Sequence, residues 1–248
     1  MSTCQRLPTA ADLGIPCAVS FPESVQRQLQ RCLSALRERL PDLEPCGKET
    51  GTGAKRPRVS PDHDLVLGPY HISLSRAFPV RYKQIPELVV NLKDELRQGT
   101  RRCDSLLLLM HPSHNLSFVL LPTASFEAAL DGGWEVFVND ERTRTFLALS
   151  LGQGTQETNA MTRRVDSALR PLGLPVYYDD PRPHVSVAWL PGDQRTTLEA
   201  MLADMVESFQ LEQVSWGFRV EEVLCVTGNK VHRVWASASI KTHHHQTH

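Results

Sequence analysis

Two short segments of this chain share an alternating pattern, and they constrain its fold more than any other feature. They are YHISLS at residues 70–75 and PHVSVAW at residues 183–189, one in each half of the chain. Strict alternation predicts a β-strand at each, with a His-x-Ser unit on one face and aliphatic side chains on the other. The duplication indicates two related lobes, each containing one such strand.

The polar residues of these strands are His71 with Ser73, and His184 with Ser186. A single His-x-Ser unit is weak evidence of function, because a lone strand histidine is more often structural than catalytic. Brought together, two units offer a general acid, a general base and two neutral hydrogen-bond donors to one small anionic group. Such a set meets the requirements of phosphodiester cleavage without a metal.

The paired motifs resemble those of the 2H phosphoesterase superfamily, which is named for two such histidines. Three further segments resemble its U6 small nuclear RNA phosphodiesterase branch: ERTRTF at residues 141–146, Tyr178 with DP at residues 180–181, and GNK at residues 228–230. The resemblance runs from about residue 18 to about residue 230. It implies a bilobal α+β fold of two pseudo-symmetric lobes, with antiparallel strands, flanking helices and an active site in the cleft between the lobes.

The resemblance also implies an activity. The expected protein is a metal-independent 3′–5′ RNA exonuclease that trims the oligouridine tail of U6 small nuclear RNA and leaves a 2′,3′-cyclic phosphate. His71 and His184 would be catalytic, and Ser73 and Ser186 would donate to phosphate oxygens. In the family the first histidine accepts the proton and the second donates one, whereas the sequence alone leaves these roles interchangeable. No cofactor or metal is expected, and the six cysteines show no metal-ligand spacing.

The loop ahead of the second motif supplies candidate substrate contacts. Tyr178, at the position that stacks in the resembled family, is expected to stack on a base of single-stranded RNA, and Arg182 to contact phosphate or sugar. Tyr177 is expected to be structural. Asp140 stands where the family tends to carry an amide, which leaves the strength of base preference open. The expected ligand is the uridine-rich 3′ end of a single-stranded RNA, bound by a monomer that does not cleave DNA.

Two alternatives to this function stay open. One is a sibling 2H enzyme that acts on 2′,3′-cyclic phosphates or on 2′,5′ linkages of transfer RNA. The other is a nucleotide- or RNA-binding module that kept the fold and lost turnover. The presence of both histidines and both serines argues against the second.

Composition narrows the class of partner. The chain has 27 basic and 28 acidic residues among 248, so a protein that coats nucleic acid through many phosphates is not expected. The apolar run at residues 106–121 is interrupted by HPSHN and is too short and broken to span a membrane. The expected location is nuclear, although the basic KRPR at residues 55–58 is as compatible with a solvated loop as with a nuclear localisation signal.

Periodicity and chain-breaking residues predict one catalytic domain over residues 18–240. It is expected to contain a flexible loop at residues 41–64 and an insertion relative to the family at residues 105–123, either a hairpin or an exposed apolar segment. Residues 1–17 and 241–248 are expected to be flexible, the latter including three consecutive histidines to which no metal is assigned. Predicted helices cover residues 23–40, 84–98, 157–172 and 195–209, and predicted further strands cover residues 16–21, 134–139, 145–151, 216–225 and 232–237.

Overall fold

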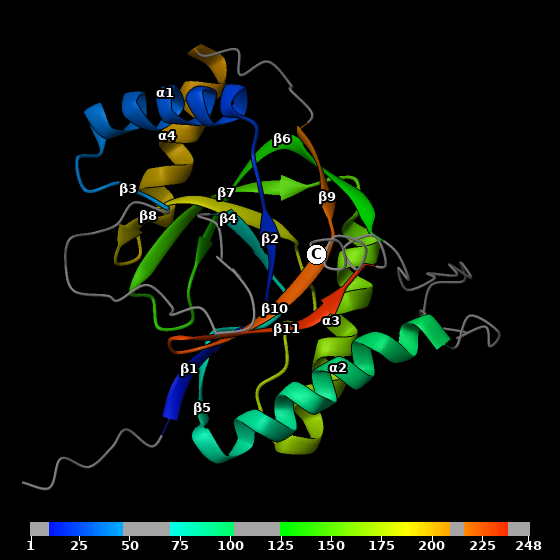
Figure 1. The fold of residues 1–248 in the computed structure, drawn as a ribbon. Helices are drawn as coiled ribbons and strands as arrows, with labels where there is room; N and C mark the ends of the chain where they lie inside the picture. The colour runs from blue at the N-terminus through cyan, green and yellow to red at the C-terminus, as the bar shows by residue number, and fades with distance from the viewer. Residues whose placement is uncertain (1–9, 47–69, 102–124, 209–215, 238–248) are drawn as a thin grey trace, which may run out of the picture.

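The structure, a computed structural model, describes residues 10–46, 70–101, 125–208 and 216–237. Within these ranges the chain forms a four-stranded and a seven-stranded antiparallel sheet, with four α-helices packed around them (Figure 1). The predicted α+β class is confirmed.

The seven-stranded sheet has the order β2-β4-β8-β7-β6-β9, and β3 joins it by pairing with β8. Its strands are β2 (Pro16–Val19), β3 (Glu44–Pro45), β4 (Tyr70–Ser73), β6 (Phe126–Val138), β7 (Arg144–Leu151), β8 (His184–Pro191) and β9 (Trp216–Val220). The smaller sheet has the order β11-β10-β1-β5. Its strands are β1 (Ala10–Gly14), β5 (Phe78–Arg81), β10 (Glu222–Thr227) and β11 (Lys230–Ala236). The two predicted motif strands, β4 and β8, are therefore neighbours in the middle of the molecule.

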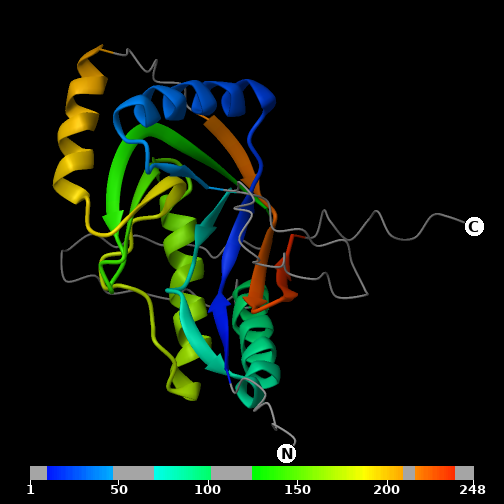
Figure 2. The same ribbon diagram turned by 90° about the vertical axis from the view of Figure 1, so that its left-hand side faces the viewer.

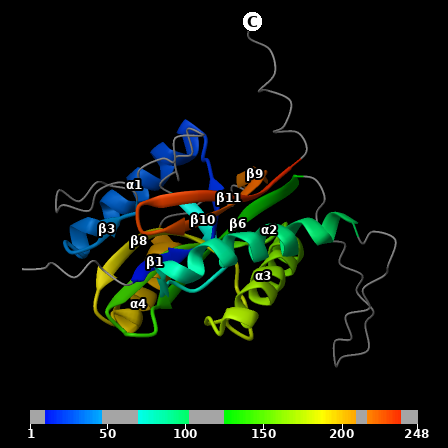
Figure 3. The same cartoon turned by 60° about the horizontal axis from the view of Figure 1, so that its bottom comes forward.

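The helices lie in two groups. They are α1 (Glu23–Arg39), α2 (Ile85–Arg101), α3 (Thr155–Leu169) and α4 (Arg195–Ser208). Figures 1 and 2 show α1 and α4 together at one end of the molecule, with α2 and α3 toward the other. Helix α2 packs against α3 and lies along β11 (Figure 3). The helices thus pack at two ends of the molecule, with the sheets between them.

Helix α1 illustrates why these residues form a helix. Val25, Leu29, Leu33 and Leu36 recur at helical spacing and are its buried residues, while Pro41 prevents continuation of the helix. Burial of each leucine side chain stabilises the fold by about 1.5–3 kcal/mol relative to exposure. Leu29→Ala would leave a cavity and is expected to cost about 2–5 kcal/mol.

Short connections carry the chain from one sheet to the other. Ile15 links β1 to β2, and the chain from β4 to β5 crosses back beside it. Leu74 N donates to Ile15 O at 2.8 Å, and Ile15 N donates to Ser75 Oγ at 3.1 Å. The two crossings are therefore bonded to each other. Ser75, buried at this junction, is a structural serine.

Two segments expected to be flexible contain ordered strands. Residues 10–14 form β1, which pairs with both β5 and β10, and Leu13 and Ile15 are buried. Within the predicted loop at residues 41–64, Leu43 is fully buried and β3 pairs with β8. For residues 10–17 and 41–46 the predictions were therefore wrong, because the apolar side chains there find partners in distant strands, which local composition does not reveal.

Several element boundaries also differ from the prediction. Helix α2 continues through Gly99 to Arg101, since one glycine costs only about 1 kcal/mol in a helix. Strand β6 begins at Phe126 rather than at residue 134, and a register shift between Leu130 and Trp134 accommodates the interrupted alternation. The single strand predicted at residues 216–225 is divided at Glu221 into β9 and β10, which belong to different sheets.

Some predictions fall outside the described residues. These are the insertion at residues 105–123, the basic segment at residues 55–58, most of the predicted loop at residues 41–64, and the tail at residues 241–248.

Candidate active site

The pairing of β4 with β8 places the predicted catalytic side chains together. Ile72 and Val185 are opposite each other in the antiparallel register and are 1% and 0% exposed. Since side chains alternate along a strand, the residues flanking this pair point to the other side of the sheet. Those residues are His71 and Ser73 on β4, and His184 and Ser186 on β8, and all four are partly exposed.

The same side of the sheet continues across β7 and β6. Ser150 is opposite His184, and Ala148 is opposite Ser186. Glu135 is opposite Ala148, and Phe137 is opposite Phe146. This surface is called the histidine face below, and its members are His71, Ser73, His184, Ser186, Ser150, Ala148, Phe146, Glu135 and Phe137.

The imidazole of His184 is held in two ways. Its Nδ1 lies 2.8 Å from the carbonyl oxygen of Arg182. A carbonyl oxygen can only accept, so Nδ1 carries the hydrogen and Nε2 is the nitrogen left to exchange a proton with a ligand. The ring also stacks on Phe137, with centroids 3.9 Å apart and ring planes at 14°.

Glu135 connects several of these groups. It accepts hydrogen bonds from Ser150 Oγ at 2.6 Å and from Arg182 at 3.1 Å. The guanidinium of Arg182 also lies 4.9 Å above the ring centroid of Phe137. Arg182, predicted as a substrate contact, is thus tied to the histidine face, while its side chain remains 55% exposed.

Burial lowers the pKa of both histidines. For His71 the positive charge of His184 lowers the pKa further. For His184 the Arg182 carbonyl and the Glu135 carboxylate act in the opposite direction and raise the pKa, while the Arg182 guanidinium lowers it. The two imidazoles are therefore not equivalent, since only His184 has neighbours that favour its protonated form.

Tyr178 belongs to a second cluster beside this face. It is 47% exposed, and its hydroxyl donates to Asp140 at 3.0 Å. Arg76 forms an ion pair with Asp140 and lies 4.9 Å over the Tyr178 ring. Tyr177 contacts Tyr178 edge-on at 5.2 Å, and burial raises the pKa of Tyr177 to about 12. These positions fit an accessible ring at Tyr178 and a structural one at Tyr177.

Three residues of the site were not identified from the sequence. Glu135 and Phe137 alternate within a predicted strand, so their shared side was available as a signal. The sequence carries no signal for their position next to His184, because that position depends on the order of strands β6, β7 and β8. Arg76 follows Ser75 directly after the first motif, but only the fold brings it to Asp140.

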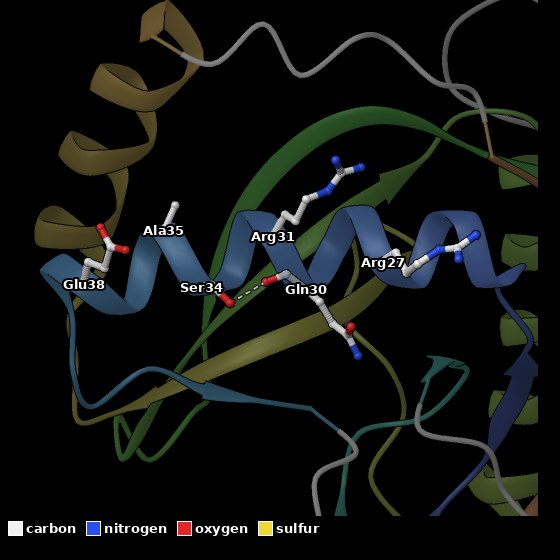
Figure 4. A pocket seen from close by; sticks show the side chains of 6 residues that line it. All are labelled: Arg27, Gln30, Arg31, Ser34, Ala35 and Glu38. Carbon is white, nitrogen blue, oxygen red and sulfur yellow. Dashed lines mark hydrogen bonds between the residues drawn. The ribbon is translucent and has the colours of Figure 1, made fainter.

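Outside the histidine face, the described ranges contain few features that suggest a site. No group of three or more His, Cys, Asp or Glu side chains that could hold a metal ion occurs within the described ranges. In the same ranges, no helix is long and apolar enough to cross a membrane. A hollow of about 460 Å³ lies on the exposed side of α1, and none of its lining residues belongs to the histidine face (Figure 4). They are Arg27, Gln30, Arg31, Ser34, Ala35 and Glu38.

Two antiparallel sheets and two neighbouring His-x-Ser strands agree with the 2H phosphoesterase arrangement that the sequence resemblance implies. A model of the HVSL family, described as an uncharacterised conserved protein, matches residues 18–235. The chain belongs to the HVSL family.

Curated relatives agree with the branch indicated by the sequence. U6 snRNA phosphodiesterase 1 of Xenopus laevis is 27% identical over 168 residues, which cover 66% of this chain and 57% of the relative. The Drosophila melanogaster protein of the same name is 30% identical over 161 residues, covering 64% and 52%. The chain thus matches little more than half the length of these relatives.

A solved structure shows the same fold. It is the structure of Kluyveromyces marxianus Usb1 with uridine monophosphate, with a TM-score of 0.50 and 17% sequence identity. The superposition covers 90% of this chain and 97% of the yeast protein. The bilobal α+β architecture is therefore shared.

Proposed function

We propose that this protein is a metal-independent 3′–5′ RNA exonuclease that trims the 3′ oligouridine tail of U6 small nuclear RNA. The observation that carries the proposal is the pairing of His71 and Ser73 with His184 and Ser186 on one side of strands β4 and β8. The names of the curated relatives, U6 snRNA phosphodiesterase 1, support the choice of RNA.

The proposed reaction uses the substrate's own nucleophile. The 2′-hydroxyl of the penultimate nucleotide attacks the neighbouring phosphorus and gives its proton to His71. A 2′-oxygen–phosphorus bond forms, the bond from phosphorus to the departing 5′-oxygen breaks, and His184 protonates that oxygen through Nε2. The products are an RNA with a 2′,3′-cyclic phosphate end and a free nucleoside. Imidazoles suit both roles because their pKa lies near neutrality.

The surroundings of the histidines support this assignment of base and acid. The carboxylate of Glu135 and the carbonyl of Arg182 favour a protonated His184, as an acid requires. Burial and the charge of His184 favour a neutral His71, as a base requires.

Ser73 and Ser186 would donate to the non-bridging oxygens, where negative charge grows in the transition state. Tyr178 would stack on the terminal base, either on the ring side away from Arg76 or by replacing the guanidinium. Arg182 would contact the phosphate or the sugar through its exposed part. Asp140 could accept a hydrogen bond from a uracil imide, although Arg76 now holds it.

The proposed ligand is the uridine-rich 3′ end of single-stranded RNA, bound by a monomer. The proposed location is the nucleus, because the RNA in the relatives' name is a small nuclear RNA. DNA lacks the 2′-hydroxyl and would not be cleaved.

The test is mass spectrometry of the products formed from a 3′-uridylated single-stranded RNA in the presence of EDTA. A shortened RNA with a 2′,3′-cyclic phosphate is expected, together with released uridine. A matched RNA with a 2′-deoxy penultimate nucleotide should remain intact. Loss of activity in EDTA and its return with magnesium would overturn the two-histidine mechanism. If the protein opens 2′,3′-cyclic phosphates but does not trim the RNA, it is a sibling 2H enzyme. If it binds the RNA but does not cleave it, it is a non-catalytic module.

A further inference from the structure

The end of β8 beyond Ser186 carries a feature that the proposed reaction does not use. The guanidinium carbon of Arg144 lies 4.8 Å from the ring centroid of Trp189. Trp189 is opposite Phe146 in the register, and Phe146 belongs to the histidine face. The indole is therefore on the same side of the sheet as His184 and Ser186.

A β-bulge is what places Trp189 there. Ser186 is opposite Ala148 and Ala188 is opposite Leu147, so Val187 is an extra residue with no partner on β7, while its carbonyl oxygen accepts from Cys46 N. Val187 and Ala188 are both fully buried. Strict alternation from His184 would instead have put Ala188 on the histidine face and the indole in the core, so the sequence prediction fails beyond Ser186. Bulges next to active sites often redirect a side chain in this way.

Arg144 keeps its charge available to a ligand. It is exposed, and within the described residues it makes no ion pair. The neighbouring Arg142 is paired with Asp193, while Arg76 and Arg182 are paired with Asp140 and Glu135.

Glu44 of β3 is opposite Trp189 in the register, on the other side of β8 from Arg144. It forms no ion pair with Arg144 in the part of the chain that the structure describes. The guanidinium plane over the indole therefore presents an un-neutralised, flat cation at the surface.

We propose that Arg144 and Trp189 form a second base-binding subsite in the path of single-stranded RNA, for a nucleotide upstream of the one that carries the attacking 2′-hydroxyl. Unstacked bases bind to aromatic rings and to guanidinium planes, so an arginine that covers an indole offers both surfaces. Ser186 and Trp189 lie roughly 7–10 Å apart along the strand at about 3.3 Å per residue, so one RNA strand can reach both. The proposal rests on the proposed function, because it assumes that RNA is cleaved beside Ser186.

The test compares two substrates, the dinucleotide UpU and a longer 3′-uridylated RNA. UpU contains the terminal base and the nucleoside that carries the attacking 2′-hydroxyl, but no nucleotide upstream of that nucleoside. The readout is the ratio of kcat/KM for the long RNA to that for UpU, which a general loss of folded enzyme does not change. Arg144→Ala and Trp189→Leu should lower this ratio about five- to a hundredfold, mainly through KM. Arg144 is exposed, so Arg144→Ala should fold normally. This variant therefore still decides the test if Trp189→Leu does not fold.

Two further variants sharpen the result. Arg144→Lys retains the charge without the planar group, so it should lower the ratio of kcat/KM values nearly as much as Arg144→Ala does. An unchanged ratio in Arg144→Lys would mean that the side chain holds only a phosphate, and it would overturn base stacking. Arg163→Ala removes one exposed charge from α3, outside the site, and should leave the ratio unchanged.

Equilibrium binding separates this proposal from the proposed function. Fluorescence anisotropy with RNAs of increasing length should show an affinity gain for upstream nucleotides in the unmodified protein and its loss in Arg144→Ala. If neither substrate is cleaved, the proposed function fails, while the binding series still decides the subsite. An equal length dependence in both proteins would overturn the subsite.

Discussion

Phe137 and His184 stack on each other although two strand positions separate them in the sheet. Their ring centroids are 3.9 Å apart. Strand β7 lies between their strands, with Ser150 opposite His184 and Phe146 opposite Phe137. The stacking restrains the ring plane, and the bond from Nδ1 to the Arg182 carbonyl restrains rotation within that plane.

Replacement of Phe137 should therefore affect turnover more than binding. Phe137→Leu removes a ring contact worth about 0.5–1.5 kcal/mol, so we expect a two- to tenfold lower kcat with little change in KM. Single-turnover kinetics on oligouridine measure this. Phe126→Leu, at the other end of β6, is the matched control and should keep kcat. A folded Phe137→Leu protein with normal kcat would contradict the positioning role.

The three serines near the first and second motifs should respond differently to the same substitution. Ser73→Ala and Ser186→Ala should lower kcat about 10²–10³-fold if each hydroxyl donates where charge develops. Ser75→Ala should instead lower the free energy of unfolding by about 1–3 kcal/mol, because the buried Ile15 N–H loses its acceptor. Denaturant titrations and rate measurements on all three variants make the comparison. Equal kinetic effects at the three positions would remove Ser73 and Ser186 from the chemistry.

The pH dependence of kcat/KM should be bell-shaped, with its maximum on the acid side of the ordinary histidine pKa of about 6.5. The active form needs a neutral His71 and a protonated His184, and the pKa of each is lowered. Activity should rise as His71 loses its proton and fall as His184 loses its own. The two limbs report the coupled pair rather than either residue alone.

Substitution of Glu135 tests the origin of the alkaline limb. The carboxylate favours protonated His184, so Glu135→Gln should lower the pKa of His184 further and move that limb to lower pH. Glu127→Gln is the matched control, since Glu127 is on the same strand and also pairs with an arginine, Arg219. An unmoved alkaline limb in Glu135→Gln would show that another group acts as the acid.

Tyr178 should contribute to binding rather than to chemistry. Tyr178→Ala is expected to weaken RNA binding by about 1–3 kcal/mol, with a raised KM and a similar kcat. Tyr178→Phe keeps the ring and loses only the hydrogen bond to Asp140, so it should bind nearly as well as the unmodified protein. Binding titrations with short oligouridine distinguish the two variants. If both bound equally weakly, the hydroxyl rather than the ring would be responsible.

Local sequence pattern was sufficient for much of the fold. The alternation around Ile72 and Val185 predicted two strands with one buried side, and both residues are almost completely buried. The apolar spacing from Val25 to Leu36 predicted α1 in the same way. Such patterns are readable because burial on one side of a strand or helix repeats at a fixed local period. The paired His-x-Ser units also predicted which side chains would meet, since a duplicated motif contains both halves of the site.

Tertiary structure alone decided the surroundings of those side chains. The stacking of Phe137 on His184, the contact of Glu135 with Arg182, and the approach of Arg76 to Asp140 all depend on which distant strands and loops become neighbours. The bulge at Val187 depends on the register between β7 and β8, and it reverses the side to which Trp189 points. A strand's own sequence sets its alternation, but its partner sets its register, so one extra unpaired residue changes the side of every residue that follows.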